Sequence, residues 1–302
     1  MDTLTQVVFP AMGNTVNLTV IGDHELIDVA TRRIAELESR WSRFIATSDV
    51  SRLNRSAGRP TPVHADTVTL VNYLVSAQAM TNGAFDPTLS PVLNDLGYAT
   101  SRTSSVGTCT LDPQSRAGCD LSTTLIDTRF DAITLPHGAT LDPGGLGKGL
   151  AADIVATELI ALDAHGVCLS IGGDVRCAGV GPIDGSWIIE VAHPRGDDTL
   201  LGRIRLGNGA VATSSVHAKR WARDGESVHH VIDPARRAPL EVGDESIIQS
   251  SVIAAEAVWA EVFATRALVQ QGAATQVDLA CMTVRADGRV ETTGRWKDYL
   301  DE

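Results

Sequence analysis

The sequence has little positive charge for its length, and this shortage limits what the protein can bind. Its 302 residues include 25 Lys and Arg against 37 Asp and Glu, which gives a formal net charge of −12. A protein of this charge has no broad electrostatic attraction to nucleic acid or to an anionic membrane. We therefore expect no nucleic-acid partner, and an anionic ligand needs local positive charge or a metal ion.

Long hydrophobic runs and closely paired cysteines are also missing. The first residues show neither the basic segment and apolar run of a signal peptide nor the cysteine of a lipoprotein anchor. No run of about 18 apolar residues is present to span a bilayer. The five cysteines are widely spaced without a C-x-x-C motif, which argues against a metal site or a disulfide framework. We expect a cytoplasmic protein with reduced thiols, and leave the pairing of Cys109 with Cys119 open.

What the sequence does contain is a mixture of helical and strand-like patterns. Apolar residues at steps of three and four predict an amphipathic helix over 25–44, and a polar loop follows over 48–60. Further helices are expected over 65–80, from the glycine-rich stretch to about 164, and over 254–270. Alternating or apolar segments predict strands at 15–22, around 124–141, at 166–174, in an antiparallel meander over 186–233, and at 277–288.

The order of these elements indicates the fold class. Helices and strands are mixed without steady βαβ alternation, so the sequence predicts an α+β protein. We expect one domain over 1–302, a single compact unit of two lobes with mixed or antiparallel sheets and a ligand cleft between the lobes. Residues 99–120 are rich in Ser, Thr and Gly and are expected to form a flexible insertion.

The stretch LDPGGLGKGLAAD, residues 141–153, is typical of a backbone turn that approaches an anion closely. It is not a Walker A loop, because Asp142 and Gly149 stand where that loop needs Gly and Ser or Thr. A dinucleotide fingerprint could use Gly147, Gly149 and Ala152, with Asp174 further on. However, Pro and Gly break the preceding segment, so the buried strand that this fingerprint requires is missing.

A third interpretation is a phosphate and metal site. Lys148 could neutralise phosphate, Asp142 could orient a ligand or a cation's water, and a turn carbonyl could bind Mg²⁺. Glu261 and Thr265 lie four residues apart on a predicted helix, so both side chains face the same way. The simpler alternative is that the glycine-rich stretch only turns the chain into a helix. Glu261 and Thr265 are then ordinary helix residues without a ligand.

Eight segments, in order from residue 11 to 268, resemble those of the ApbE family of flavin transferases, the FAD:protein FMN transferases. They are AMGNTVNL, ESRWSRFIATSDVSRLNRSAG, TNGAFDPTLSPVLNDLGY, LDPGGLGKGLAAD, LSIGGDVRCAG, VATSS, HHVIDP and AEVFATRAL. The resemblance departs from the family pattern at three places: Glu261 replaces an Asp, Ser214-Ser215 replaces Ser-Gly, and Gly147 replaces a common Ala.

The resemblance implies a role for each matching residue. It implies a flavin-nucleotide pocket lined by Met12, Phe44, Ala84, Phe85 and Asp86. It further implies that Asp142 and Lys148 contact FAD, and that Mg²⁺ is bound by a backbone oxygen near Gly145, by Glu261 and by Thr265. His230, with Val231 and Ile232, would lie beside the pyrophosphate, and His230 and Lys148 are the expected catalytic residues. Alternatively, Met12 and Phe44 are core residues and His230 is an ordinary strand histidine, with His229 on the opposite face.

The activity that the resemblance implies is Mg²⁺-dependent transfer of FMN from FAD to a Ser or Thr hydroxyl of an acceptor protein, with release of AMP. His230 or Asp86 could assist deprotonation of the acceptor. Two alternatives stay open: a Mg²⁺-dependent FAD pyrophosphatase that gives FMN and AMP, and an FAD-binding protein whose chemistry has lapsed. A nicotinamide oxidoreductase is a more distant alternative.

Overall fold

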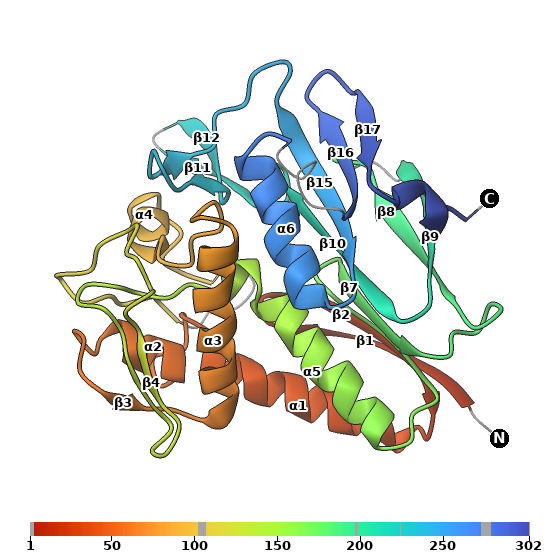
Figure 1. The fold of residues 1–302 in the computed structure, drawn as a ribbon, viewed down its shortest axis with the longest axis horizontal. Helices are drawn as coiled ribbons and strands as arrows, with labels where there is room; N and C mark the ends of the chain where they lie inside the picture. Colours follow the sequence, from red (N-terminus) through yellow and green to blue (C-terminus); the bar gives the residue numbers. More distant parts are fainter. Residues whose placement is uncertain (1–2, 102–106, 197–198, 224, 273–278, 302) are drawn as a thin grey trace. The chain divides into compact units, whose positions relative to one another are not determined.

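The computed structural model describes residues 3–101, 107–196, 199–223, 225–272 and 279–301 (Figure 1). The chain forms two compact units. We call Met1–Ile34, Lys148–Lys219 and Glu241–Glu302 the sheet unit, and Ala35–Gly147 with Arg220–Leu240 the helical unit. In the described ranges, no helix combines the length and the apolar character that a membrane crossing requires.

The sheet unit is built on an eight-stranded antiparallel sheet. The strand order is β1 (Thr3–Ala11), β2 (Asn14–Gly22), β6 (Gly166–Ile171), β7 (Asp174–Gly179), β10 (Gly209–Ser215), β15 (Ile247–Ala254), β16 (Ala280–Arg285) and β17 (Val290–Thr293). A separate hairpin consists of β8 (Trp187–Ala192) and β9 (Leu200–Leu206). All strand pairs within the described ranges are antiparallel, which confirms the predicted α+β class.

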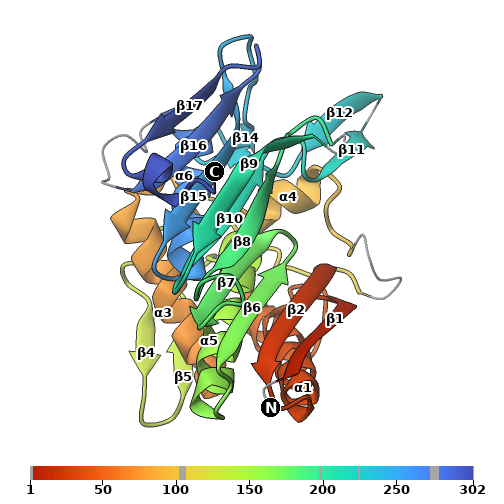
Figure 2. The same cartoon turned by 90° about the vertical axis from the view of Figure 1, so that its right-hand side faces the viewer.

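Both faces of the sheet are covered, because alternate side chains of its central strands pack to opposite sides. On one face, α6 (Ala257–Val269) packs on β10 and β15, with Val252 of β15 against Ala264. On the other face, Ile253 joins Trp187 of the β8–β9 hairpin and Trp296 of a 3-10 helix (Trp296–Tyr299). The hairpin lies in front of the main sheet in Figure 2. This explains why β15 is buried along nearly its whole length.

The helical unit contains short strands and several helices. Helix α1 (Glu25–Trp41) begins in the sheet unit and ends in the helical unit. The helices that follow are α2 (Asp49–Asn54), α3 (Ala65–Met80), α4 (Ser90–Asp95) and the 3-10 helix η1 (Pro143–Gly145). The strands form three small sheets: β3 (Thr61–Pro62) with β5 (Ala132–Thr134) and β4 (Leu125–Asp127), β11 (Arg220–Arg223) with β12 (Glu226–His229), and β13 (Ile232–Asp233) with β14 (Ala238–Pro239). Helix α5 (Gly147–Ala161) then leads back into the sheet unit.

The polar loop expected over 48–60 is wrong in its first half. Helix α2 forms there because Ser48 caps it, its hydroxyl accepting a 3.0 Å bond from the Ser51 amide. Val50 and Leu53 are fully buried on its inner side. Two apolar residues three positions apart are too few to produce a recognisable period, so the capping serine was the only local signal.

Other predicted boundaries need correction. The helix expected over 25–44 ends at Trp41, so Phe44 lies beyond it. The strand signals around 124–141 reduce to β4 and β5, and the expected meander over 186–233 divides among four sheets. Strand β1 and helix α4 were not predicted. The helix over 65–80 is confirmed as α3.

Parts of three predictions lie outside the described residues. They are 102–106 of the expected insertion, 197–198 and 224 of the expected meander, and 277–278 of the last expected strand. All five cysteines are free thiols, so Cys109 and Cys119 are not bridged.

Candidate functional site

Lys148 lies at the centre of a buried charge cluster in the sheet unit. It is the second residue of α5, and its ammonium contacts Glu261 of α6 and, at 3.0 Å, the Asp174 carboxylate at the start of β7. The second Glu261 oxygen accepts a 2.9 Å hydrogen bond from the Gly149 amide. The side chains of Lys148, Asp174 and Glu261 are only 15%, 5% and 4% exposed. Two carboxylates therefore share one ammonium in a setting that water reaches poorly.

Burial and mutual charge interactions shift the pKa values of this cluster. Burial lowers the pKa of Lys148, but Asp174 and Glu261 outweigh it and raise that pKa above its usual value. Burial also raises the pKa of Glu261 to about 7, and Asp174 acts in the same sense, although Lys148 and the Gly149 amide oppose them. Since one ammonium cannot offset two carboxylates, the cluster favours an additional positive charge.

Strand β10 places polar groups next to Asp174 and Thr265. The Thr213 amide donates to Asp174 at 3.1 Å, and the Thr213 and Ser251 hydroxyl oxygens are 2.8 Å apart. The Ser214 and Thr265 hydroxyl oxygens are 3.1 Å apart. Thr265 therefore lies one helical turn from Glu261, as the spacing predicted, and Ser214 is its hydrogen-bonding partner. The Ser-Ser sequence supplies oxygen atoms at this position.

The start of α6 is fixed to α5, and this sets the position of Glu261. The Asp153 carboxylate accepts 2.9 Å hydrogen bonds from the amides of Ala257 and Val258, the first residues of α6. Arg176 adds an ion pair to Asp153 at 3.0 Å. Gly149 permits the close approach, because a Cβ there would lie 2.5 Å from the Ala257 carbonyl oxygen. The second glycine of the G-K-G sequence is therefore required by packing.

Asp142 lies in the helical unit and is held by Arg43. The Arg43 Nε lies 3.1 Å from one Asp142 oxygen, and the other oxygen accepts from the Gly144 amide at 2.9 Å. Arg43 also donates to the Asn94 side-chain oxygen at 3.0 Å and to the Tyr98 carbonyl at 2.8 Å. The Arg43 side chain is 3% exposed, so its guanidinium is enclosed by these acceptors. Asp142 is thus fixed at the N-cap of η1, in the same glycine-rich stretch of the sequence as Lys148.

An aromatic row continues from Arg43. The guanidinium lies 4.3 Å from the centre of the Phe44 ring, and Phe44 meets Tyr98 edge to face with ring centres 5.8 Å apart. Tyr98 stacks on Trp221 at 5.3 Å, and the Trp221 indole donates to the Leu96 carbonyl at 2.7 Å. Phe44, Tyr98 and Trp221 are all half-buried. Such rings can stack on a planar ligand.

The segment Ala84–Asp86 packs against the glycine turn inside the helical unit. Ala84 and Phe85 are buried, and a Cβ on Gly145 would lie 2.8 Å from the Phe85 ring. One Asp86 oxygen accepts bonds from the Thr88 amide at 2.8 Å and the Thr88 hydroxyl at 2.7 Å. The Phe85 ring therefore packs closely against Gly145 of the turn. Both bonds from Thr88 go to the same Asp86 oxygen.

The remaining predicted residues divide between core and loop positions. The side chains of Val231 and Ile232 are buried, so the backbone at these positions is the part that a ligand could meet. His229 is buried, with Nε2 3.1 Å from the Leu240 carbonyl oxygen, and His230 beside it is half-buried. Met12 has a left-handed backbone, φ 51°, in the turn between β1 and β2.

Sequence reasoning missed three residues that build these clusters: Asp174, Asp153 and Arg43. Asp174 belongs to the GGD sequence and Asp153 ends the glycine-rich stretch, so both belong to recognised motifs. Nothing in the sequence indicated that Asp174 pairs with Lys148 or that Asp153 binds the first amides of α6. Arg43 preceded the expected aromatic residue Phe44. Within the described ranges, no group of three or more His, Cys, Asp or Glu side chains is placed to hold a metal ion.

Comparison with protein families matches residues 12–282 to the ApbE family. An FAD:protein FMN transferase of Vibrio cholerae serotype O1 is 26% identical over 269 residues, covering 86% of this chain and 79% of the relative. An FAD:protein FMN transferase of Haemophilus influenzae is 24% identical over 245 residues, covering 76% of this chain and 71% of the relative. These curated relatives are enzymes of the transferase class, in agreement with the prediction from the sequence.

Solved structures share the fold. The ApbE protein of Thermotoga maritima superimposes with a TM-score of 0.82 at 22% identity, covering 99% of this chain and 100% of that one. The apo form of the flavinyl transferase ApbE of Pseudomonas stutzeri gives a TM-score of 0.79 at 23% identity, covering 99% and 97%.

Proposed function

The chain belongs to the ApbE family, and from this premise we propose that it transfers the FMN moiety of FAD to a Ser or Thr hydroxyl of an acceptor protein. The curated relatives with the matching name support flavin transfer as the reaction class. The observation that carries the proposal is the buried cluster of Lys148, Asp174 and Glu261, whose lysine belongs to the same glycine-rich stretch of sequence as Asp142. We further propose a cytoplasmic location, which the five free thiols support.

The donor set of the cluster fits Mg²⁺. Its side chains offer carboxylate and hydroxyl oxygens, the ligands that this hard cation prefers. Two carboxylates, Asp174 and Glu261, share the single ammonium of Lys148, so the cluster has room for a further positive charge. We propose that Glu261 and Thr265, with a backbone oxygen near Gly145, hold the ion. When bound, Mg²⁺ supplies positive charge that neutralises the pyrophosphate.

The other residues bind and orient the dinucleotide in this proposal. Lys148 neutralises phosphate charge, and the fixed Asp142 carboxylate orients the nucleotide. Phe44 offers an aromatic ring to the flavin, alongside Met12 and the segment Ala84–Asp86. The backbone of Val231 and Ile232 lies along the pyrophosphate.

The reaction exchanges the phosphoanhydride bond of FAD for a phosphoester bond to the acceptor. The acceptor hydroxyl oxygen bonds to the phosphorus of the FMN half, and the bond from that phosphorus to the bridging oxygen breaks. AMP leaves with the bridging oxygen, and His230 accepts the hydroxyl proton. Positioning and charge neutralisation provide most of the acceleration in such transfers.

The test combines the protein with FAD, Mg²⁺ and a Thr-containing acceptor peptide, and follows the peptide by intact mass. We expect a gain of one FMN unit that EDTA abolishes. Glu261→Gln should lose at least about 100-fold in rate, because it removes the carboxylate that faces Lys148. Glu256→Gln is the matched control: Glu256 is exposed and makes no side-chain capping bond at the start of the same helix.

Three outcomes separate the proposal from its alternatives. Release of free FMN and AMP without acceptor modification would identify a pyrophosphatase. Tight FAD binding with no product would identify a lapsed enzyme. The observation that favours this alternative is the contact of Lys148 with Glu261, which stands where the family pattern has an Asp. In that case Glu261→Asp should restore activity.

A further inference from the structure

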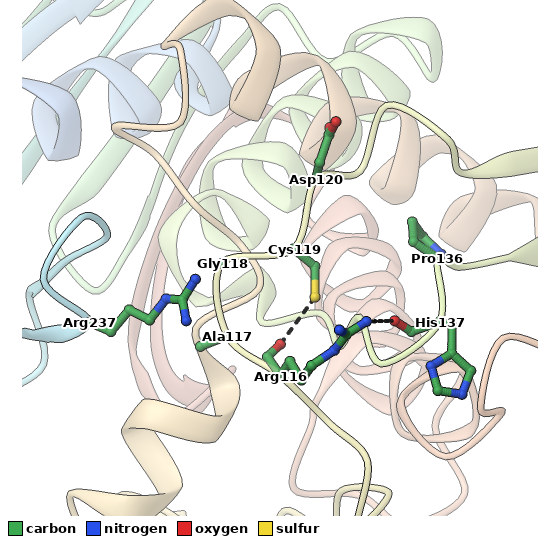
Figure 3. Close-up of a pocket in the computed structure, with 8 residues that line it drawn as sticks. All are labelled: Arg116, Ala117, Gly118, Cys119, Asp120, Pro136, His137 and Arg237. Carbon is green, nitrogen blue, oxygen red and sulfur yellow. Dashed lines mark hydrogen bonds between the residues drawn. The ribbon is translucent and has the colours of Figure 1, made fainter.

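The helical unit contains a cavity apart from the clusters described above (Figure 3). Its volume is about 580 Å³, within the range of sites for small organic ligands. Its lining includes Arg116 and Cys119, His137 from the segment after β5, and Arg237 from the β13–β14 turn. Figure 3 shows Arg116 and Arg237 reaching this cavity from different segments of the chain.

Two glycines make room for the two guanidinium groups. Gly118 has φ 72°, and a Cβ there would lie 2.9 Å from an Arg237 Nη atom. Gly138 has φ 81°, and a Cβ there would lie 2.9 Å from the Arg116 Nε. Each guanidinium therefore packs directly against the backbone of a glycine. A side chain at either glycine would occupy the space that the guanidinium fills.

The backbone at Arg237 is unusual in the same way. Its φ is 52°, a left-handed conformation that favours glycine and is costly for a long side chain. Within the described ranges, the Arg237 side chain has neither a hydrogen bond nor an ion pair. The turn thus carries a cation at a position better suited to glycine, and no carboxylate of the described residues forms an ion pair with it. Residues held in such conformations cluster at ligand sites.

The remaining charges leave the cavity cationic. Arg116 donates one 2.8 Å bond to the His137 carbonyl and has no ion pair among the described residues. Asp120 turns its carboxylate to Ser122, accepting from its amide and hydroxyl at 2.8 Å each. Burial raises the pKa of the Cys119 thiol and Asp86 adds to the rise, while Arg116 and Arg237 both act to lower it. Among the lining residues themselves, two guanidinium groups stand against the single carboxylate of Asp120.

We propose that this cavity binds a phosphate monoester through Arg116 and Arg237. Guanidinium groups present paired N–H donors that match phosphate oxygens, and a dianion with three terminal oxygens can use both of them. The remaining volume accommodates the organic part of the ligand. This inference is independent of the proposed flavin transfer.

The test is a calorimetric titration of the protein with inorganic phosphate as the probe, at constant ionic strength set with sodium chloride. We expect saturable binding that weakens roughly tenfold or more in Arg237→Gly and in Arg116→Gln. Arg237→Gly should fold at least as well as the wild type, because glycine suits the left-handed backbone. Arg236→Gln removes the same charge one residue away, outside the cavity lining, and should bind phosphate like the wild type.

Two results would overturn the proposal. One is phosphate binding that is unchanged in both Arg237→Gly and Arg116→Gln, or no saturable binding at all. The other is binding of malonate in preference to phosphate, which would assign the cavity to dicarboxylates.

Discussion

At the scale of single residues, Arg43 shows how a buried cation can hold a functional acid. Its planar guanidinium reaches the Asp142 carboxylate, the Asn94 amide oxygen and the Tyr98 carbonyl at once. Lysine has one nitrogen at the end of a flexible chain and cannot match three acceptors in different directions. The position of Asp142 therefore depends on the shape of the Arg43 side chain as well as on its charge.

Arg43→Lys should destabilise the protein by about 2–3 kcal/mol, since at least one buried acceptor loses its donor. The variant should also raise the KM for FAD more than it lowers kcat, because Asp142 is no longer oriented. Urea unfolding and steady-state kinetics measure these effects. Arg32→Lys, the same exchange at an exposed position of α1, should leave both unchanged. Equal effects in the two variants would refute a positioning role for Arg43.

At the scale of elements, the approach of α5 to α6 determines whether Lys148 can meet Glu261. Gly149 sets how closely the two helices pack, and Asp153 joins α5 to the first amides of α6. Neither feature touches a ligand in the proposed function. Both nonetheless determine the geometry of the charge cluster.

Gly149→Ala should destabilise the protein although alanine favours helices. The gain in helix propensity is about 1 kcal/mol, whereas forcing a methyl group to within 2.5 Å of the Ala257 carbonyl oxygen costs about 1–3 kcal/mol and shifts the helices. Gly147→Ala is the matched control, because its Cβ would lie 3.2 Å from only one side-chain atom of Pro143. Thermal unfolding compares the two variants, and a Gly149→Ala protein as stable as Gly147→Ala would contradict this account.

The Asp153 junction should make stability depend on pH. Burial raises the pKa of Asp153 to about 6 from 3.8, although the α6 amides and Arg176 lower it. The folded state then holds the proton more tightly than the unfolded state, so this group's contribution to stability falls as pH rises from about 4 to 6. The decrease amounts to about 3 kcal/mol.

Urea unfolding across that pH range tests this expectation. In Asp153→Asn, the free energy of unfolding should decrease less between pH 4 and 6 than in the wild type. Asp28→Asn, at an exposed position of α1, should show the wild-type dependence on pH. The Asn variant should also be less stable near neutral pH, because Arg176 loses its buried partner. A slope that is the same in all three proteins would exclude this role for Asp153.

At the scale of the whole molecule, the net charge of −12 opposes the approach of an anionic dinucleotide. Like charges repel over about 10 Å at moderate ionic strength, and added salt screens this repulsion. The Lys148 cluster does not reverse the effect locally, because two carboxylates face one ammonium.

The association rate of FAD should therefore increase with sodium chloride concentration, opposite to the behaviour of electrostatically steered ligands. Stopped-flow fluorescence of the flavin measures this rate. Riboflavin, which lacks phosphate groups, is the control and should associate at a rate that salt does not change. A rate for FAD that falls with salt would show that local positive charge dominates the field.

Local sequence patterns predicted the fold better than they predicted the site. The period of apolar residues was sufficient for α3 and most of α1, because that period arises from the helix itself. It failed for α2, which is too short for a period to appear. The resemblance correctly identified the family, and the spacing placed Glu261 and Thr265 on one helical turn. No local pattern indicated that Asp174 is the second partner of Lys148.

The sequence by itself determined the charge balance, the principal helices, the α+β class and the ApbE family, because composition, periodicity and ordered motifs are properties of the chain. Only the tertiary structure decided which charges meet. Lys148 and Glu261 are 113 positions apart, and their contact exists because α5 and α6 pack where Gly149 and Asp153 allow it. Arg43 and Asp142, and the two arginines of the cavity, are likewise paired by packing. Such pairings depend on distances between elements, which no stretch of the sequence records.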